Sequence, residues 1–233
     1  MHTTTRPAQD GFTDVSLRDI DKQKVPASGE IYGTLINLSG RRRVTSQRVI
    51  LFAVLASISH EGALAEAQSA LEILSEAHKI LIEGNRSLPG VFSEQLHTAY
   101  FGPSQGHQKI AGFISLAQQT IKAISLNAKD ALALLNQLVA SANPMLALFN
   151  QITLVYEEEL NRYTEKSKRQ TIELMSNIQS ISKEASIVSV NAQIIAAHAG
   201  GAGREFSVVA RALSDITGRI DMLAFKALKN LAA

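Results

Sequence analysis

Two helical repeats that meet at a cluster of glycines constrain the fold of this chain more than any other feature. Gly200, Gly201 and Gly203 lie between the two repeats. On both sides, apolar residues recur at alternating spacings of four and three, which is the heptad pattern of packed helices. They are Leu174, Ile178, Ile181, Ala185, Val188, Ala192, Ile195 and Ala199 before the glycines, and Phe206, Val209, Leu213, Ile216, Ile220, Leu223 and Ala227 after them. The pattern predicts an antiparallel helical hairpin with a tight tip.

The rest of the chain also reads as helix, so we expect an all-α protein. Helical patterns cover residues 29–60, 63–82, 93–99 and 106–124, and a fourth long helix begins at residue 128. Asn127 is a plausible N-cap of that helix, and Pro144 should cause a kink or a brief break in it. No breaker follows between residues 145 and 199. We therefore predict a flexible leader (1–28), a four-helix bundle (29–150) and a coiled-coil hairpin (151–233) continuing directly from its last helix.

Composition excludes several classes of function. The chain of 233 residues has a net charge of only +2, which argues against nucleic-acid binding. It contains no cysteine, and its histidines lack metal-ligand spacing, so we expect no metal, no cofactor and no enzymatic activity. The most apolar run, residues 49–58, is about half the ~20 residues of a membrane-spanning helix. We expect a cytoplasmic protein without a membrane span.

The residues around the glycine tip form a second recognisable pattern. It consists of Asn191-Ala192, Ala196-Ala197, Ala199-Gly200, Gly203-Arg204, Phe206 and Val208-Val209-Ala210. Over about fifty residues this pattern resembles the signalling tip of bacterial methyl-accepting chemotaxis receptors, which in that family binds the histidine kinase CheA and the coupling protein CheW. The resemblance implies a partner-binding tip made by Asn191, Ile195, His198, Gly200, Gly203, Arg204, Phe206 and Val209.

The chain departs from the receptor pattern in two ways. Ile195, His198 and Gly201 stand where the family usually has Glu, Arg and Glu. We also expect the arm after the turn to be too short to carry the family's adaptation methylation sites. We therefore expect weak or absent coupling to CheA and CheW.

A run of arginines near the start of the first helix is the second informative segment. Ile36, Gly40, Arg43, Gln47, Ile50 and Val54 form one stripe, while Arg42 projects about 100° away from Arg43. A guanidinium in an apolar seam needs a counter-charge, and no acid lies between Glu30 and Glu61. In a symmetric dimer, a small planar anion could neutralise two copies of Arg43. A solvated arginine face, or pairing of Arg43 with a distant glutamate, remains the alternative.

This segment resembles the N-terminal box of PilJ-type sensor domains, the type IV pilus methyl-accepting chemotaxis transducer N-terminal family. The matching residues are Asn37, Ser39-Gly40, Arg43 and Ser46-Gln47-Arg48. Residues 81–84 and 145–159 also resemble this family, and together with the box they cover about residues 30–160. In related nitrate sensors, the arginine aligned with Arg43 holds nitrate between two protomers. The resemblance implies an anion site, for nitrate or nitrite, formed by Arg43, Gly40, Asn37, Gln47 and Arg42.

Together these patterns predict a homodimeric sensory protein. An oxyanion bound at Arg43 would signal through the long fourth helix to the tip. The alternative is a helical interaction protein that assembles with chemoreceptors or other helical partners and binds no ligand.

Overall fold

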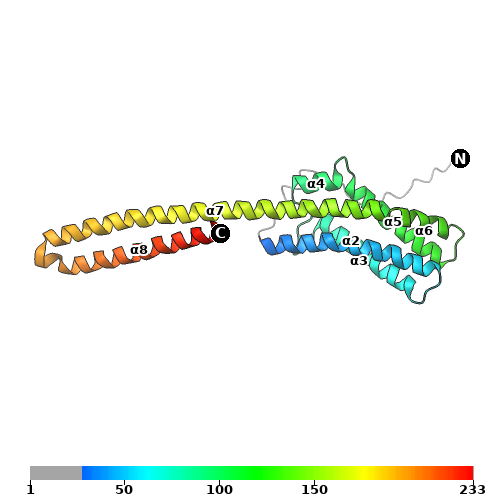
Figure 1. Cartoon of the computed structure of the whole chain (residues 1–233), viewed down its shortest axis with the longest axis horizontal. Helices are drawn as coiled ribbons and strands as arrows, with labels where there is room; N and C mark the ends of the chain where they lie inside the picture. The colour runs from blue at the N-terminus through cyan, green and yellow to red at the C-terminus, as the bar shows by residue number, and fades with distance from the viewer. Residues whose placement is uncertain (1–27, 233) are drawn as a thin grey trace, which may run out of the picture. The chain divides into compact units, whose positions relative to one another are not determined.

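The computed structural model describes residues 28–232, and all regular secondary structure in that range is helical (Figure 1). No strand occurs among these residues, only an isolated bridge between Gly84 and Pro89. The all-α prediction is confirmed. The predicted leader lies outside the described residues except for Ser28, whose side chain accepts a hydrogen bond from the Ile31 amide and caps the first described helix.

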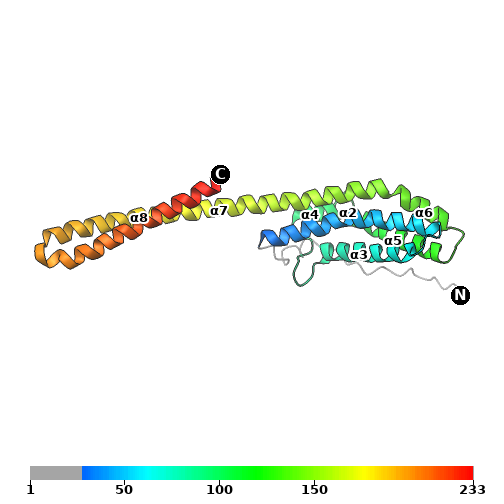
Figure 2. The ribbon, with the colours of Figure 1, turned by 60° about the horizontal axis from the view of Figure 1, so that its bottom comes forward.

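The described residues form two compact units that divide after Asn161. The first unit contains α2 (Gly29–Ser57), α3 (Ala63–Glu83), α4 (Glu94–Phe101), α5 (Gly106–Ser125) and α6 (Ala131–Ala140). The long helix α7 (Ala142–His198) begins in this unit and continues into the second. Helix α2 packs on α3 and α5, as the two views of Figures 1 and 2 also show, and α4 packs on α5.

Aliphatic and aromatic side chains from all of these helices build the core of the first unit. Small residues on α3 let it approach α2 closely, because Ala67, Ala70 and Ala77 are all buried. The largest of its fully buried apolar side chains are Leu35, Leu74, Leu81, Leu96, Tyr100, Ile110, Leu138, Phe149, Ile152 and Tyr156. Polar side chains are buried among them, and these define the candidate site described below.

One detail of the helix ends differs from the sequence prediction. Asn127 is not an N-cap: it has a φ of 48° and its amide donates to Ile124 O, so it terminates α5 in the left-handed conformation that asparagine tolerates. The predicted break near Pro144 is present, because α6 and α7 are separate helices bent by 41° where they meet. Pro144 lies in the first turn of α7, where a missing N–H breaks no helical hydrogen bond.

The second unit pairs the end of α7 with α8 (Arg204–Ala232) across a short 3-10 turn, Gly200–Gly203. Ser182 Oγ donates to Thr217 O at 2.6 Å, and Ser189 Oγ donates to Ala210 O. Ser189 follows Ser182 on α7, whereas its partner Ala210 precedes Thr217 on α8. The two helices therefore run antiparallel, as Figures 1 and 2 show. We call this element the α7–α8 pair.

The seam between the two helices is made of small residues. A single heptad row is buried along both helices and through the turn: Ser182, Ser189, Ala196, Gly203, Ala210, Thr217 and Ala224. At Gly203 a Cβ would lie 2.0 Å from Ala196 O, so only glycine fits there. The helices therefore approach more closely than large side chains would allow.

Among the described residues, no single helix is both long and apolar enough to cross a membrane. Helices α6 and α7 taken together are long and apolar enough, but they are bent by 41° where they meet.

Candidate functional site

The arginine segment of α2 places its two central arginines in different environments. Arg42 is fully buried, whereas Arg43 is half-buried and Gln47 is exposed. The sequence interpretation had put Arg43 in the apolar seam and turned Arg42 away, and that part of it is wrong. The buried face of α2 runs through Leu35, Ser39, Arg42, Ser46, Val49 and Ala53, and its two serines hide it from a pattern of apolar residues.

The side chain of Arg43, on α2, forms hydrogen bonds to uncharged groups of α2 and α7. Its Nη1 donates to Asn150 Oδ1 at 2.9 Å and its Nε to Gly40 O at 3.4 Å. A Cβ on Gly40 would meet Arg43 Nη2 at 3.1 Å, so glycine leaves room for the guanidinium to fold back along the helix. The structure thus brings together Arg43 and Gly40 of the predicted anion site. It adds Asn150, which sequence reasoning did not single out.

The remaining members of the predicted anion site are spread around α2. Asn37 and Gln47 are exposed, about one helical turn from Gly40 and Arg43. Val44 and Leu51 are exposed on the same helix, at 64% and 53%. The described residues contain no carboxylate that pairs with Arg43, while the neighbouring Arg48 pairs with Glu66 at 2.8 Å. The charge of Arg43 is therefore not neutralised within these residues.

Arg42 is held by hydrogen bonds to uncharged groups. Its Nη1 is 3.2 Å from His78 Nδ1, its Nη2 donates to Ser39 Oγ at 3.0 Å, and its Nε points to Ser39 O at 3.5 Å. The guanidinium also lies 5.1 Å from the centre of the Phe149 ring and 5.8 Å from that of Tyr100. These aromatic faces stabilise a buried cation that has no carboxylate partner in the described part of the chain.

The histidine and tyrosine beside Arg42 are held neutral. Burial, with the charge of Arg42 and the neighbouring His107, lowers the pKa of His78 well below its ordinary value. Burial also raises the pKa of Tyr156 well above its ordinary value, and the nearby Tyr100 adds to that rise. Sequence reasoning could not find these partners, because His78, Tyr100 and Tyr156 come from three helices with no shared spacing.

The predicted tip residues divide into two groups on the α7–α8 pair. Gly200, Gly203 and Arg204 line a shallow groove of about 420 Å³, together with Ala196, Ala197, Ser207, Val208 and Arg211. Asn191, Ile195, His198, Phe206 and Val209 are exposed and do not line it. Arg211 was missed, although its spacing of seven from Arg204 puts both arginines on one face of α8.

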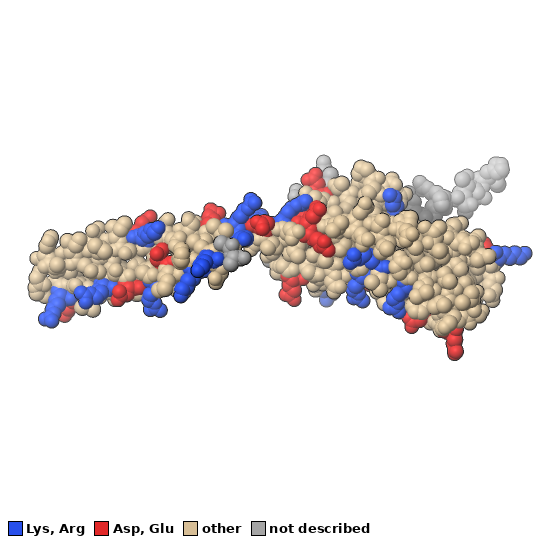
Figure 3. Space-filling model, in the orientation of Figure 1, with Lys and Arg blue, Asp and Glu red and all other residues tan. Residues whose placement is uncertain are grey.

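The large apolar heptad residues of the α7–α8 pair do not form the seam between the two helices. Ten of the eleven large ones are exposed, and only Ile178 is half-buried. The ten are Leu174, Ile181, Val188, Ile195, Phe206, Val209, Leu213, Ile216, Ile220 and Leu223. On the face in Figure 3, much of the surface of this pair carries no charged side chain. We call this set of ten residues the apolar face.

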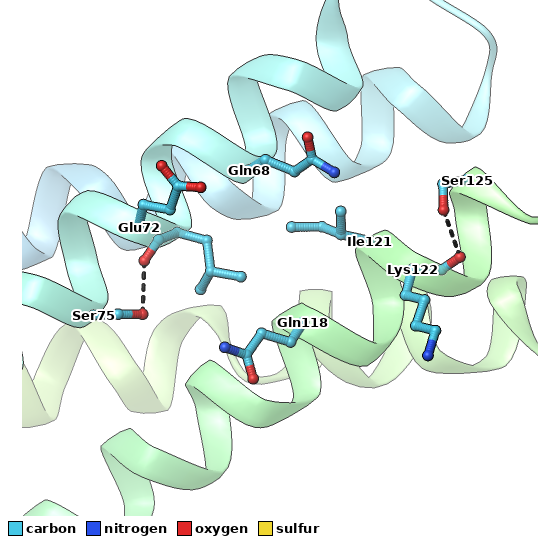
Figure 4. A pocket seen from close by; sticks show the side chains of 8 residues that line it. Gln68, Glu72, Ser75, Gln118, Ile121, Lys122 and Ser125 are labelled. Carbon is cyan, nitrogen blue, oxygen red and sulfur yellow. Dashed lines mark hydrogen bonds between the residues drawn. The ribbon is translucent and has the colours of Figure 1, made fainter.

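A second groove, of about 390 Å³, lies between α3 and α5 in the first unit (Figure 4). Leu71 and Ile121 line it with polar side chains of both helices. Two of its hydroxyls are directed to their own helices, since Ser75 donates to Leu71 O and Ser125 to Lys122 O. No polar groups converge on a point within it, so we assign it no ligand.

Comparison with known proteins gives no match to a protein-family model, to a curated protein or to a solved structure. The fold and the geometry above define an all-α protein with an arginine-centred site and an exposed apolar face. The resemblances to PilJ-type sensors and to chemoreceptor tips stay predictions.

Proposed function

We propose that this protein is a helical signalling protein that acts as a homodimer through the apolar face of its α7–α8 pair. The observation that supports the proposal is that small and large residues of these two helices occupy different faces. Small residues form their seam, and the large apolar heptad residues are left outside, with Val188 and Val209 at 61% and 64% exposed. Heptad apolar positions that are not used between two helices are the positions at which further helices pack.

The apolar face supplies a substantial part of the area that a dimer interface needs. Burying one large aliphatic side chain corresponds to roughly 60–120 Å², from about 1.5–3 kcal/mol at about 25 cal/mol per Å². Ten such side chains, each about half exposed, therefore offer several hundred Å². A stable interface buries about 800 Å² per partner, so the apolar face would form its centre and the flanking side chains would supply the rest.

A second copy of this chain is the occupant we propose. The apolar face repeats with the same spacing on both helices, so two copies related by a twofold axis would present matching surfaces to each other. Each copy would contribute two helices to a bundle of four, with the apolar faces as its core. Other helical partners, including chemoreceptors, are alternative occupants.

Two neighbouring valines on α8 give a matched test of the dimer. Val209 belongs to the apolar face and is 64% exposed, while Val208 is 68% exposed but projects about 100° away. Val209→Glu should raise the dimer dissociation constant at least about 100-fold, because each copy would bury an unpaired carboxylate. Val208→Glu should leave it within about threefold of the wild-type value. Sedimentation equilibrium of the full chain measures both, and a monomeric wild type or equal effects of the two variants would exclude this interface.

We further propose that Arg43 binds a small oxyanion of the nitrate or nitrite kind between two copies. The support is that Arg43 has only neutral partners and more N–H groups than its two hydrogen bonds use. A planar anion would accept from the guanidinium in the paired geometry that carboxylates adopt. The proposed signal then passes along α7, which has residues in both units, to partners at the tip.

Titration calorimetry with nitrate and nitrite tests the ligand. We expect heat with the wild type and none with Arg43→Ala, whereas Arg41→Ala, which removes an exposed arginine of the same segment, should bind normally. No heat with either anion would remove the sensing proposal and leave the dimer proposal standing. We propose a cytoplasmic location and expect weak or no capture of CheA and CheW, which a pull-down with purified proteins measures.

A further inference from the structure

Five polar side chains form one continuous hydrogen-bonded chain inside the first unit. It starts at Thr153 on α7, whose Oγ1 lies 2.9 Å from Ser39 Oγ on α2. Ser39 accepts from Arg42 Nη2 at 3.0 Å, and Arg42 Nη1 lies 3.2 Å from His78 Nδ1 on α3. The chain ends at His107 on α5, where His78 Nε2 lies 3.1 Å from His107 Nδ1. It joins four helices and ends at a half-buried histidine, while His78 itself is buried.

The chemistry of the donors fixes where the protons lie. Arginine has no acceptor, so Arg42 must donate and His78 Nδ1 must accept. The proton of neutral His78 is then on Nε2, which makes it the donor to His107 Nδ1. His107 therefore accepts on Nδ1. Only the neutral form of both histidines satisfies every bond in this chain.

A proton added to either ring breaks the chain. A proton on His78 Nδ1 would turn this acceptor into a donor that faces the N–H of Arg42 Nη1, and it would put two positive charges about 3.2 Å apart. On His107 it would remove the acceptor that His78 uses, and the two stacked rings have centroids only 5.2 Å apart. His107 would take up the first proton, because His78 is 3% exposed and His107 is half-buried.

The groups packed around the two histidines give little compensation. Arg42 on α2 opposes a positive charge on His78, whose ring centroid lies 6.1 Å from that of Tyr100 on α4. Tyr156 on α7 is neutral for the reason given above. Glu83 on α3 is the acidic group that favours a charge on His107, but burial outweighs it and the pKa of His107 is lowered.

We propose that the His78–His107 pair is an acid-sensitive latch that holds α5 against α2 and α3 at neutral pH and releases it on mild acidification. The latch is independent of the proposed dimer and of any anion at Arg43. Helix α5 is the element that moves, because it contributes His107 and packs on both α2 and α3.

The sign and size of the effect follow from linkage. The folded protein disfavours protonation of both histidines, whereas the open state takes up protons at the ordinary histidine pKa of about 6.5. The stabilising effect of the latch is therefore present above about pH 6.5 and is lost as the pH falls below it. Below this value the opening constant should rise about tenfold per pH unit for one proton, and about a hundredfold for two.

Amide hydrogen exchange of the full-length protein at pH 7.5 and 5.5, corrected for intrinsic exchange rates, measures the opening. Wild-type peptides of α3 and α5 should exchange at least about tenfold faster at pH 5.5. His78→Gln keeps an acceptor for Arg42 and a donor for His107 but cannot take up a proton, so its pH response should be smaller than that of the wild type. The double variant His78→Gln, His107→Gln should show none.

The exposed histidine of the same unit is the matched control. His60→Gln should respond to pH like the wild type, because His60 is exposed and lies outside the chain. If His78→Gln does not fold, His107→Gln alone still decides the question, since this half-buried position should lose most of the response. An unchanged corrected exchange rate in the wild type, or an equal loss in His60→Gln and His107→Gln, would overturn the latch.

Discussion

Replacing Gly203 by alanine should force the two helices of the α7–α8 pair apart, whereas the same change at Gly201 should not. A Cβ at Gly203 would lie 2.0 Å from Ala196 O and 2.9 Å from Ala196 Cα, far inside the 3.4 Å at which ordinary contact begins. A Cβ at Gly201 would meet nothing within 4 Å. Neither glycine has a positive φ, so the two substitutions differ only in the space available.

The expected loss of stability follows from the close contacts at the seam of the α7–α8 pair. Relieving the clash requires Ala196 to retreat by about 1.4 Å, and overpacking of this kind costs about 1–3 kcal/mol. The bond from Ser189 Oγ to Ala210 O crosses the same seam and would lengthen, at about 1 kcal/mol. Gly203→Ala should therefore destabilise the α7–α8 pair by about 2–4 kcal/mol. Gly201→Ala should be neutral or stabilise by up to about 1 kcal/mol, since it restricts the unfolded chain.

Hydrogen exchange of peptides from α8 resolves the effect without interference from the first unit. A cost of about 2–4 kcal/mol corresponds to an opening constant about 30- to 700-fold larger. The exchange of α8 should rise by this factor in Gly203→Ala, while peptides of α3 should be unchanged in both variants. If Gly203→Ala exchanges no faster than Gly201→Ala, the close approach at Ala196 is not what sets the packing of this pair.

Three further predictions concern the polar groups. Arg42→Ala should destabilise the first unit by about 3–5 kcal/mol, because Ser39 and His78 lose their buried partner, and Arg41→Ala should change it by less than about 0.5 kcal/mol. Urea unfolding followed by circular dichroism compares them, and similar midpoints would refute the buried role of Arg42. Ser182→Ala should cost about 1 kcal/mol, seen as faster exchange of α8, and no change would mean that its bond to Thr217 O contributes nothing. In an ultraviolet pH titration, Tyr156 should ionise only well above the ordinary tyrosine pKa. Tyr156→Phe should therefore leave unchanged the rise in absorbance that occurs near the ordinary tyrosine pKa. A smaller rise in the variant over that pH range would contradict the burial of Tyr156.

Periodicity was sufficient to predict the class of fold and the approximate positions of most helices. Helices α3 and α5 begin where the apolar pattern and the glycines indicate, because breakers and spacing are local properties of a chain. The ends of helices were less predictable. Asn127 can cap a helix start or finish one, and here the amides of Asn127 and Ala128 donate back to Ile124 O and Ala123 O of α5, which makes it an end.

The candidate site shows the limit of the same reasoning. Arg42 and Arg43 are adjacent, so the apolar pattern of α2 alone had to decide which of them is buried. It favoured Arg43, because Ile36, Gln47 and Ile50 outlined one stripe more clearly than Ser39 and Ser46 outlined the other. Which of the two arginines is buried depends on His78 and Phe149, which approach α2 from other helices and give Arg42 its partners.

The local pattern of residues is enough to show that this chain is helical and that apolar residues repeat on both sides of a glycine cluster. These are properties of nearest neighbours along a helix, set by a period of about 3.6 residues. Packing between helices, by contrast, decided that small residues form the seam of the α7–α8 pair, so that most of its large apolar residues face outward. It also decided that Arg42, and not Arg43, joins a buried chain of polar groups. The physical reason is that burial and hydrogen bonding between helices depend on which faces meet, and no spacing within one helix specifies the face of another.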